Sequence, residues 1–190
     1  MNTRRFICAL LGAWIGASFL MASVAMFNFR VVNDIFITPQ PELVGYIKAI
    51  GPEKLRMLFR HEAAEFNRYL FEAWGFVQIG ISLLVFGTLL FGTKEGKFIL
   101  SVSLLLVLIV TGMHLLITPS IVGYGRSLDF APADKEFAMR QRVNAYHNAY
   151  TTLEGVKLAG NVMLLVIFFR EVRRRPGRGP DDEFEEIEAA

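Results

Sequence analysis

The sequence is poor in the residues that build metal and thiol sites, with one cysteine and three histidines in 190 residues. Because Cys8 is the only cysteine, no disulfide can form within the chain, and sites made of paired cysteines are excluded. Cys8 itself lies inside an apolar run. The chain also lacks the phosphate-binding glycine loop, the HExxH zinc pair and the G-x-S-x-G nucleophile turn. These absences remove the enzyme classes that are easiest to recognise from sequence.

Charge is sparse as well, with a formal net charge of +2 and only 20% charged residues. This balance gives no extended field for nucleic acid, and we expect no such partner. The charges gather near the C-terminus, where basic Arg170 to Arg178 precede an acidic segment ending at Ala190. The basic cluster is suited to anionic lipid head groups. We expect residues 171–190 to form a disordered, charged cytoplasmic tail.

What the sequence has in abundance is apolar residues, at 53% with a mean hydropathy of +0.40. Four runs are long enough to cross a bilayer, at about 6–28, 73–92, 98–118 and 151–169. The sequence therefore predicts an all-α integral membrane four-helix bundle over residues 1–170. The lipid bilayer is its first partner; a second membrane protein or another copy of the chain is an open alternative.

The first apolar run has two interpretations. Phe6–Phe27 holds 22 residues without a charge and follows Arg4 and Arg5, as a retained span requires. The small residues Ser23-Val24-Ala25 would also suit cleavage of a signal peptide. A repeat in the sequence favours retention, because it pairs this run with the third span.

The segments between the spans contain two amphipathic helices. Residues 52–72 carry apolar side chains at helical spacing and continue into the second span without a helix breaker. Residues 137–161 do the same before the fourth span. We expect irregular connectors at 28–51 and 119–132, where prolines and glycines accumulate, and a tight hairpin at 92–97.

Short motifs recur about 80 residues apart. Ile37-Thr38-Pro39 matches Ile117-Thr118-Pro119, and Gly75 and Gly80 match Gly155 and Gly160. These matches suggest a tandem repeat of a two-span unit, with units 6–92 and 98–170. Because each unit has an even number of spans, the pseudo-two-fold axis would lie along the membrane normal.

A polar stripe enters the last span at helical spacing, through Arg140, Asn144, His147, Thr151 and Glu154. At 1.5 Å per residue, Glu154 and the His114 of the third span lie roughly 22 and 24 Å above the inner ends of their spans.

Lys157 and Glu72 lie near the same level. We therefore predict an intramembrane polar cluster of His114, Glu154, Lys157 and Glu72, because ionisable groups at this depth face a bundle interior or a water-filled recess. The alternatives are structural: Glu154 and Lys157, three residues apart, pair with each other, and His114 bonds a neighbouring helix.

No cofactor is predicted. A haem held by His114 and His147, or a divalent ion held by carboxylates and histidine, remains an alternative. The carboxylate-rich set considered for such an ion is Glu62, Glu65, Glu72, His147 and Glu154.

The first span and parts of the last resemble a small family of four-span membrane proteins of unknown function that includes mammalian transmembrane protein 205. The likeness rests on Trp14-Ile15-Gly16, on Pro119 at the end of the third span, and on Arg142 with His147 before the fourth. It covers roughly residues 10–170 and implies the four-span architecture. This chain differs in its longer connectors and in Glu154 and Lys157. A weaker likeness is to four-span anthrone-oxygenase-like proteins.

The leading hypothesis is a non-enzymatic membrane protein whose outward-facing polar cluster handles a small solute or ion. The alternatives are a membrane-embedded redox or oxygenase-like enzyme, and an accessory or assembly subunit of a membrane complex. Basic residues flank the ends of spans at Arg4, Arg5, Lys94, Lys97 and the C-terminal cluster. This bias places both termini in the cytoplasm, and we expect a bacterial inner membrane.

Overall fold

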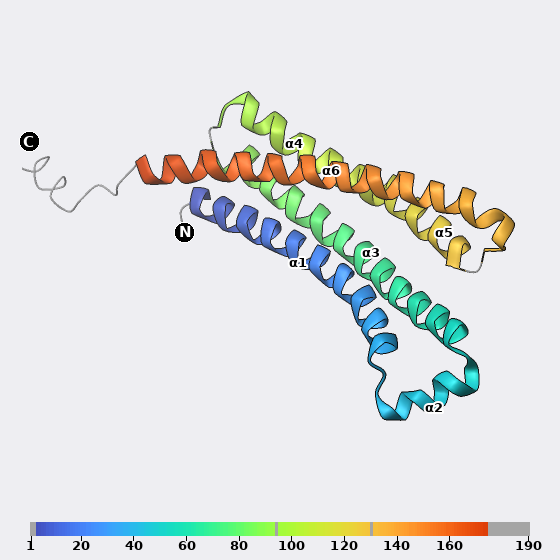
Figure 1. Cartoon of the computed structure of the whole chain (residues 1–190). Helices are drawn as coiled ribbons and strands as arrows, with labels where there is room; N and C mark the ends of the chain where they lie inside the picture. The colour runs from blue at the N-terminus through green and yellow to red at the C-terminus, as the bar shows by residue number, and fades with distance from the viewer. Residues whose placement is uncertain (1–2, 94, 130, 175–190) are drawn as a thin grey trace, which may run out of the picture.

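The computed structural model describes residues 3–93, 95–129 and 131–174. Within these ranges the protein is all-α and contains no strand. The elements are α1 (Thr3–Ile37), α2 (Pro41–Ile50), α3 (Pro52–Gly92), α4 (Lys97–Gly112), the π-helical turn η1 (Met113–Ile117), α5 (Thr118–Asp129) and α6 (Ala133–Arg174), as Figure 1 shows. Helix α6 reaches Arg174, so the first four residues of the predicted tail are helical; residues 175–190 lie outside the described ranges.

Four helices are long and apolar enough to cross a membrane, by length and composition. They are Thr3–Ile37, Pro52–Gly92, the continuous run Lys97–Asp129, and Asp134–Arg170. Each contains one of the four predicted spans. The protein is thus an integral membrane protein built on a four-helix bundle, as the sequence predicts.

The first connector is shorter than predicted, because α1 does not end near residue 28 but continues to Ile37. Its outer half is held against α3: the Asn28 amide donates to Asn67 at 2.5 Å, and the rings of Phe36 and Phe59 pack edge to face at 6.0 Å. The chain then forms α2, which starts at Pro41 and ends at Ile50. Gly51 follows it with a φ of 93°, which is costly for any residue with a Cβ.

The expectation of an irregular connector at 119–132 is wrong. Pro119 and the glycines after it lie inside α5, and only the last residues of that segment leave the helix. The third span passes through η1, where hydrogen bonds reach one residue further than in an α-helix. At this turn the Thr118 hydroxyl donates to the Met113 carbonyl at 3.1 Å. A proline directly after such a turn continues the helix because the local register has already shifted.

The helices form a bundle in which α1 contacts α3 and α6, α4 contacts α3 and α6, and α5 packs on α6. The two ends of the described chain lie at the same end of the bundle (Figure 1). At the other end, the α1–α3 pair and the α5–α6 pair diverge. We call the end that holds the termini the inner end and the opposite one the outer end.

The buried faces of the helices follow a common register. The α6 residues Lys157, Asn161, Leu164 and Phe168 each lie 79 positions after a buried α3 residue: Gln78, Ser82, Val85 and Leu89. In the same way, four buried residues of α4 each lie 92 positions after a buried residue of α1. The α1 residues are Ile7, Leu11, Trp14 and Ser18, and the corresponding α4 residues are Ile99, Ser103, Leu106 and Val110.

The motif spacing of 80 is therefore not the packing register. Pro39 lies between α1 and α2, whereas Pro119 lies inside α5, so the two Ile-Thr-Pro triplets do not occupy equivalent places. The two offsets differ because the first half carries α2 in its connector. The repeat of units 6–92 and 98–170 stays a prediction. The buried residues correspond at offsets of 79 and 92 positions and not at the offset of 80 that the motifs suggest.

Candidate functional site

Lys157 is the centre of the polar groups inside the bundle, and its side chain is 0% exposed. Its Nζ donates to Ser18 Oγ of α1 at 3.0 Å, to Gln78 Oε1 of α3, and to Glu154 Oε1 of α6 at 2.5 Å. An ammonium group has three N–H donors. Three acceptors from three helices therefore match its whole hydrogen-bonding capacity.

The inner side of this centre is closed by Trp14. Its Nε1 donates to Gln78 Oε1 at 3.3 Å, and Lys157 Nζ lies 5.6 Å from the centroid of the indole ring. Trp14 and Ser18 are four residues apart on α1, so both face the bundle. Glu154 and Lys157 are three apart on α6 and meet for the same reason.

A cavity of about 400 Å³ opens outward from this centre, between α1, α3 and α6. It is lined by Ser18, Met21, Ala22, Ala25, Met26, Phe71, Trp74, His147, Tyr150, Thr151, Glu154, Gly155 and Leu158. We call it the α1–α6 groove. Its walls are mostly apolar, and its floor is Ser18 with Glu154.

The Glu154 carboxylate has one oxygen engaged and one unengaged. Oε1 accepts from Lys157, while Oε2 is buried and has no hydrogen-bond partner within the described part of the chain. Glu154 lines the groove, so a residue of the groove carries a buried acceptor whose capacity is unused. Such a group costs free energy unless something donates to it.

The exposed lining residues of the groove include small and polar side chains and the large apolar Met26. Ala22 on α1 and Thr151 and Gly155 on α6 are all exposed. The groove thus opens between α1 and α6, on the lateral surface that lipid or solvent covers. A site at the predicted depth of Glu154 lies within reach of the hydrocarbon.

The structure divides the predicted intramembrane cluster. Glu154 and Lys157 are bonded to each other, but His114 lies elsewhere, on η1, with its ring 4.3 Å from that of Phe76. A Cβ added to Gly75 would lie 2.1 Å from His114 Nδ1, so this glycine makes the space for the ring. His114 Nδ1 is buried with no partner among the described residues.

Glu72 is half-buried on α3 and is not part of the groove lining. Of the predicted flanking stripe, His147 and Thr151 line the groove. Arg140 lies nearer the outer end, paired with Glu136, and Asn144 is exposed. The inner residues of the stripe, His147 and Thr151, therefore line the groove, whereas the outer residues, Arg140 and Asn144, lie on the surface.

Three residues of the centre were not among the predicted site residues: Trp14, Ser18 and Gln78. Gln78 carried a signal, since it is the one strongly polar residue inside the second span. Ser18 and Trp14 carried none, because serine and tryptophan are common in spans and the contact to Lys157 crosses 139 positions of sequence. Asn161, one turn inward from Lys157, is also fully buried, and neither atom of its amide has a partner in the described ranges.

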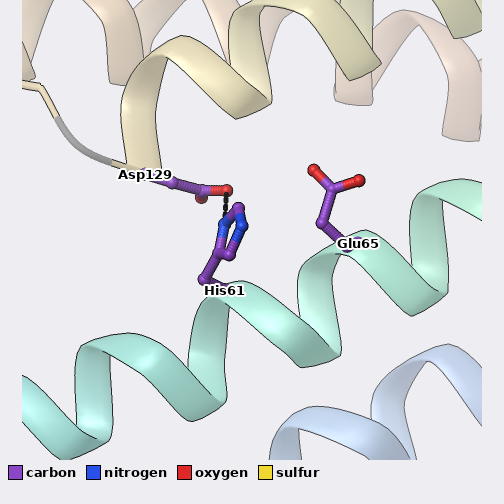
Figure 2. Close-up of side chains that lie close together, drawn as sticks. All are labelled: His61, Glu65 and Asp129. Atoms are coloured by element: carbon purple, nitrogen blue, oxygen red, sulfur yellow. Dashed lines mark hydrogen bonds and ion pairs between the residues drawn. The ribbon is translucent and has the colours of Figure 1, made fainter.

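A second polar cluster joins α3 to α5 near the outer end. His61 Nδ1 lies 2.8 Å from Asp129 Oδ2, and Glu65 lies one helical turn from His61, as Figure 2 shows. Ligand atoms of His61, Glu65 and Asp129 lie within 4.8 Å of one another. We call this set, with Arg68 and Arg126, the α3–α5 clasp.

The arginines decide the chemistry of the clasp. Arg68 Nη1 lies 2.6 Å from Glu65 Oε1 and 2.8 Å from Asp129 Oδ2, and Arg126 binds both Glu65 oxygens. Hydrogen bonding to Arg126 and then to Arg68 lowers the pKa of Glu65 to about 2; this residue lies outside the predicted span 73–92. Both carboxylates are thus already paired with arginine, and we interpret the clasp as an inter-helix ion-pair network.

Neither grouping proposed for a cofactor is reproduced by the described side chains. Of the five residues considered for a divalent ion, only Glu65 belongs to the compact clasp, and its oxygens are taken by arginine. His147 lines the groove, whereas His114 is not among its lining residues, so the two histidines do not face one cavity there. A haem or a divalent metal remains an alternative, and the described residues bring together one possible set of metal ligands, His61, Glu65 and Asp129.

Comparisons with family models, with curated proteins and with solved structures find no match. The resemblance to the family of transmembrane protein 205 stays an expectation.

Proposed function

We propose that this integral membrane protein binds a small solute in the α1–α6 groove, with the Glu154–Lys157 pair as the polar centre of the site. The observation that carries the proposal is the combination of a fully buried, fully bonded Lys157 with a buried and unpaired oxygen on Glu154, a residue that lines the cavity.

The energetics support a role beyond holding the helices together. Removing two charges from water costs several kcal/mol per ion, and an apolar pair of similar volume often stabilises a fold equally well or better. Ionisable groups inside a membrane are functional by default for this reason. A structural ion pair would also be expected to have both carboxylate oxygens satisfied, which Glu154 does not.

The geometry favours binding over chemistry on a substrate. All three donors of Lys157 are committed to Ser18, Gln78 and Glu154, so its amine is not available as a nucleophile. The remaining polar groups of the groove, on His147, Tyr150 and Thr151, lie along its walls and suit recognition of a solute.

We further propose the predicted membrane placement, with both termini in the cytoplasm of a bacterial inner membrane. The support is the excess of Arg and Lys beside the inner ends of the helices, such as Arg4, Arg5 and Lys97. In this orientation the α1–α6 groove faces the outer half of the bilayer.

The test is to identify what the protein carries. Protein purified in a mild detergent is extracted with organic solvent, and its small molecules are quantified by mass spectrometry. The double variant Glu154→Leu/Lys157→Met removes the polar centre. A matched control, Glu136→Leu/Arg140→Met, removes an exposed pair on the same helix.

We expect a small molecule to accompany the wild type and the control in a constant molar ratio, and to be absent from the double variant. Equal extracts from all three proteins, at equal folded yield, would show that the pair binds nothing and would overturn the proposal.

A further inference from the structure

We infer that the solute of the α1–α6 groove is a neutral molecule with an apolar body and a hydroxyl head, and that it enters sideways from the bilayer between α1 and α6. This inference rests on the proposed function and deepens it. It follows from which hydrogen-bonding groups of the site are used, which are free, and where the groove opens.

The hydrogen-bonding character of the solute's head group follows from the number of N–H donors that Lys157 has left. Because Lys157 spends its three N–H groups on Ser18, Gln78 and Glu154, it has none to offer a ligand. Glu154 Oε2 is the buried group at the floor with unused capacity, and a carboxylate oxygen only accepts. A head group that bonds Glu154 must therefore donate a hydrogen bond.

The charge of the head follows from the balance at the floor. Glu154 and Lys157 carry opposite charges 2.5 Å apart, so the centre is close to neutral as a unit. A carboxylate head would meet Glu154 as a like charge, and a cationic head would leave one uncompensated charge inside the membrane. A hydroxyl donates to Glu154 Oε2 with neither cost.

The body follows from the walls. Apart from its polar floor and rim, the groove is lined by aliphatic and aromatic side chains, including Met21, Phe71, Trp74 and Leu158. Its volume of about 400 Å³ lies within the range of sites that hold small molecules. An alkyl chain or an aromatic ring fits these walls, whereas a strongly hydrated solute would lose its water without replacement.

The entry route of the solute follows from the residues that surround the opening of the groove. Ala22 and Gly155, which are among the smallest side chains, are exposed on the two helices that flank the opening. A Cβ on Gly155 would meet no atom within 4 Å, so the space beside it is open. The inner side is closed by Trp14 beneath Lys157. An apolar solute dissolved in the bilayer reaches the groove from the side without crossing water.

The protein contains its own reporter, because its only two tryptophans are both at the site. Trp74 lines the groove and Trp14 lies beneath Lys157. Bromine atoms quench tryptophan fluorescence at short range. We would titrate the full chain in lipid nanodiscs with a brominated long-chain alcohol, its methyl ether and the carboxylic acid of equal chain length.

The alcohol should quench saturably, with an affinity about tenfold or more above that of the ether, since a hydrogen bond to a charged acceptor contributes roughly 1.5–3 kcal/mol. In Glu154→Gln, which keeps an oxygen for Lys157 but turns an N–H toward the groove, this preference should largely disappear. The exposed control Glu62→Gln should retain it.

Equal binding of alcohol and ether, or tighter binding of the acid, would overturn the inference about the head group while leaving a solute site in place. If none of the probes quenches saturably but the extraction experiment finds a carried molecule, the proposed function stands and the hydroxyl class is wrong. If neither experiment finds binding, both fail.

The route is tested separately by kinetics. Gly155→Leu narrows the mouth and should slow quenching by the alcohol several-fold. Gly123→Leu, at another exposed glycine with open space around it, should not change the rate. An unchanged rate in Gly155→Leu would contradict lateral entry.

Discussion

The inner and outer halves of the bundle are built by the same four helices but from different chemistry. Toward the inner end the buried residues are mostly apolar, with Ile7, Leu11, Leu164 and Phe168 all 0% exposed. The buried serines there, Ser82 and Ser103, donate to carbonyls of their own helices. From Trp14 outward the buried positions become polar: Ser18, Gln78 and Lys157 meet at one level. The inner half is a packed seal, and the outer half is a site beneath an opening.

The difference lies in single positions of a shared register. Leu164 and Phe168 continue the face of α6 that carries Lys157 and Asn161, so the helix geometry is the same in both halves. Only the side chains differ between the two halves, and the free-energy cost of burying them is higher where they are polar. Inward of Asn161, the buried side chains in the described ranges are apolar except Ser103, whose hydroxyl donates to the Leu100 carbonyl of its own helix.

The largest expected effect comes from breaking the outer centre. Lys157→Met should destabilise the protein by about 3–5 kcal/mol, because it removes the hydrogen-bond partner of Glu154 and leaves a buried carboxyl group unpaired. Adding Glu154→Leu should restore most of that loss, since an apolar pair replaces an ion pair. Thermal unfolding in detergent would compare the two, and a double variant no more stable than the single would contradict the desolvation argument.

Breaking the inner seal should affect stability and not binding. Phe168→Ala creates a cavity at a fully buried position and should cost roughly 3 kcal/mol. The groove is remote from this residue, so the alcohol affinity of the folded fraction should be unchanged. A parallel loss of affinity and stability would show that the two halves are not separable.

The close contact between α3 and η1 can be tested at one glycine. Gly75→Ala places a Cβ 2.1 Å from His114 Nδ1 and should cost about 1–3 kcal/mol through overpacking. The matched change Gly80→Ala, on the same helix with no atom within 4 Å, should be neutral or stabilising. Combining Gly75→Ala with His114→Ala should recover stability, and failure to recover would place the clash elsewhere.

The smallest effect is expected at the α3–α5 clasp. Glu65→Gln should cost about 1 kcal/mol or less, because the pair with Arg126 is partly solvated. The pKa of Glu65 is lowered from 4.5 to about 2, so its stabilisation is complete above pH about 5. It is lost as the pH falls from 4.5 to 2. Unfolding curves against pH should converge for wild type and variant in that window, and a constant difference would contradict the pairing.

The sequence predicted the membrane helices because long apolar runs are a local property. It also placed Glu154 and Lys157 together, because their spacing of three residues is local as well. It failed at Pro119, since the π-helical turn that lets the helix continue depends on hydrogen bonds that residue propensities do not reveal.

The assignment of His114 to the cluster failed for a different reason. The prediction rested on depth along the helix, and depth does not give the side of the helix on which a residue lies. The ring of His114 faces Gly75 and Phe76 on α3, away from the groove lining. Ser18 was missed because its contact to Lys157 depends on the packing of α1 against α6, which no local pattern encodes.

The most direct test is the binding of the brominated alcohol by the double variant Glu154→Leu/Lys157→Met. We predict a protein that unfolds within a few degrees of the wild type and whose tryptophans the alcohol no longer quenches saturably. Saturable quenching with wild-type affinity would contradict the account, because the groove would then bind its solute without the polar centre.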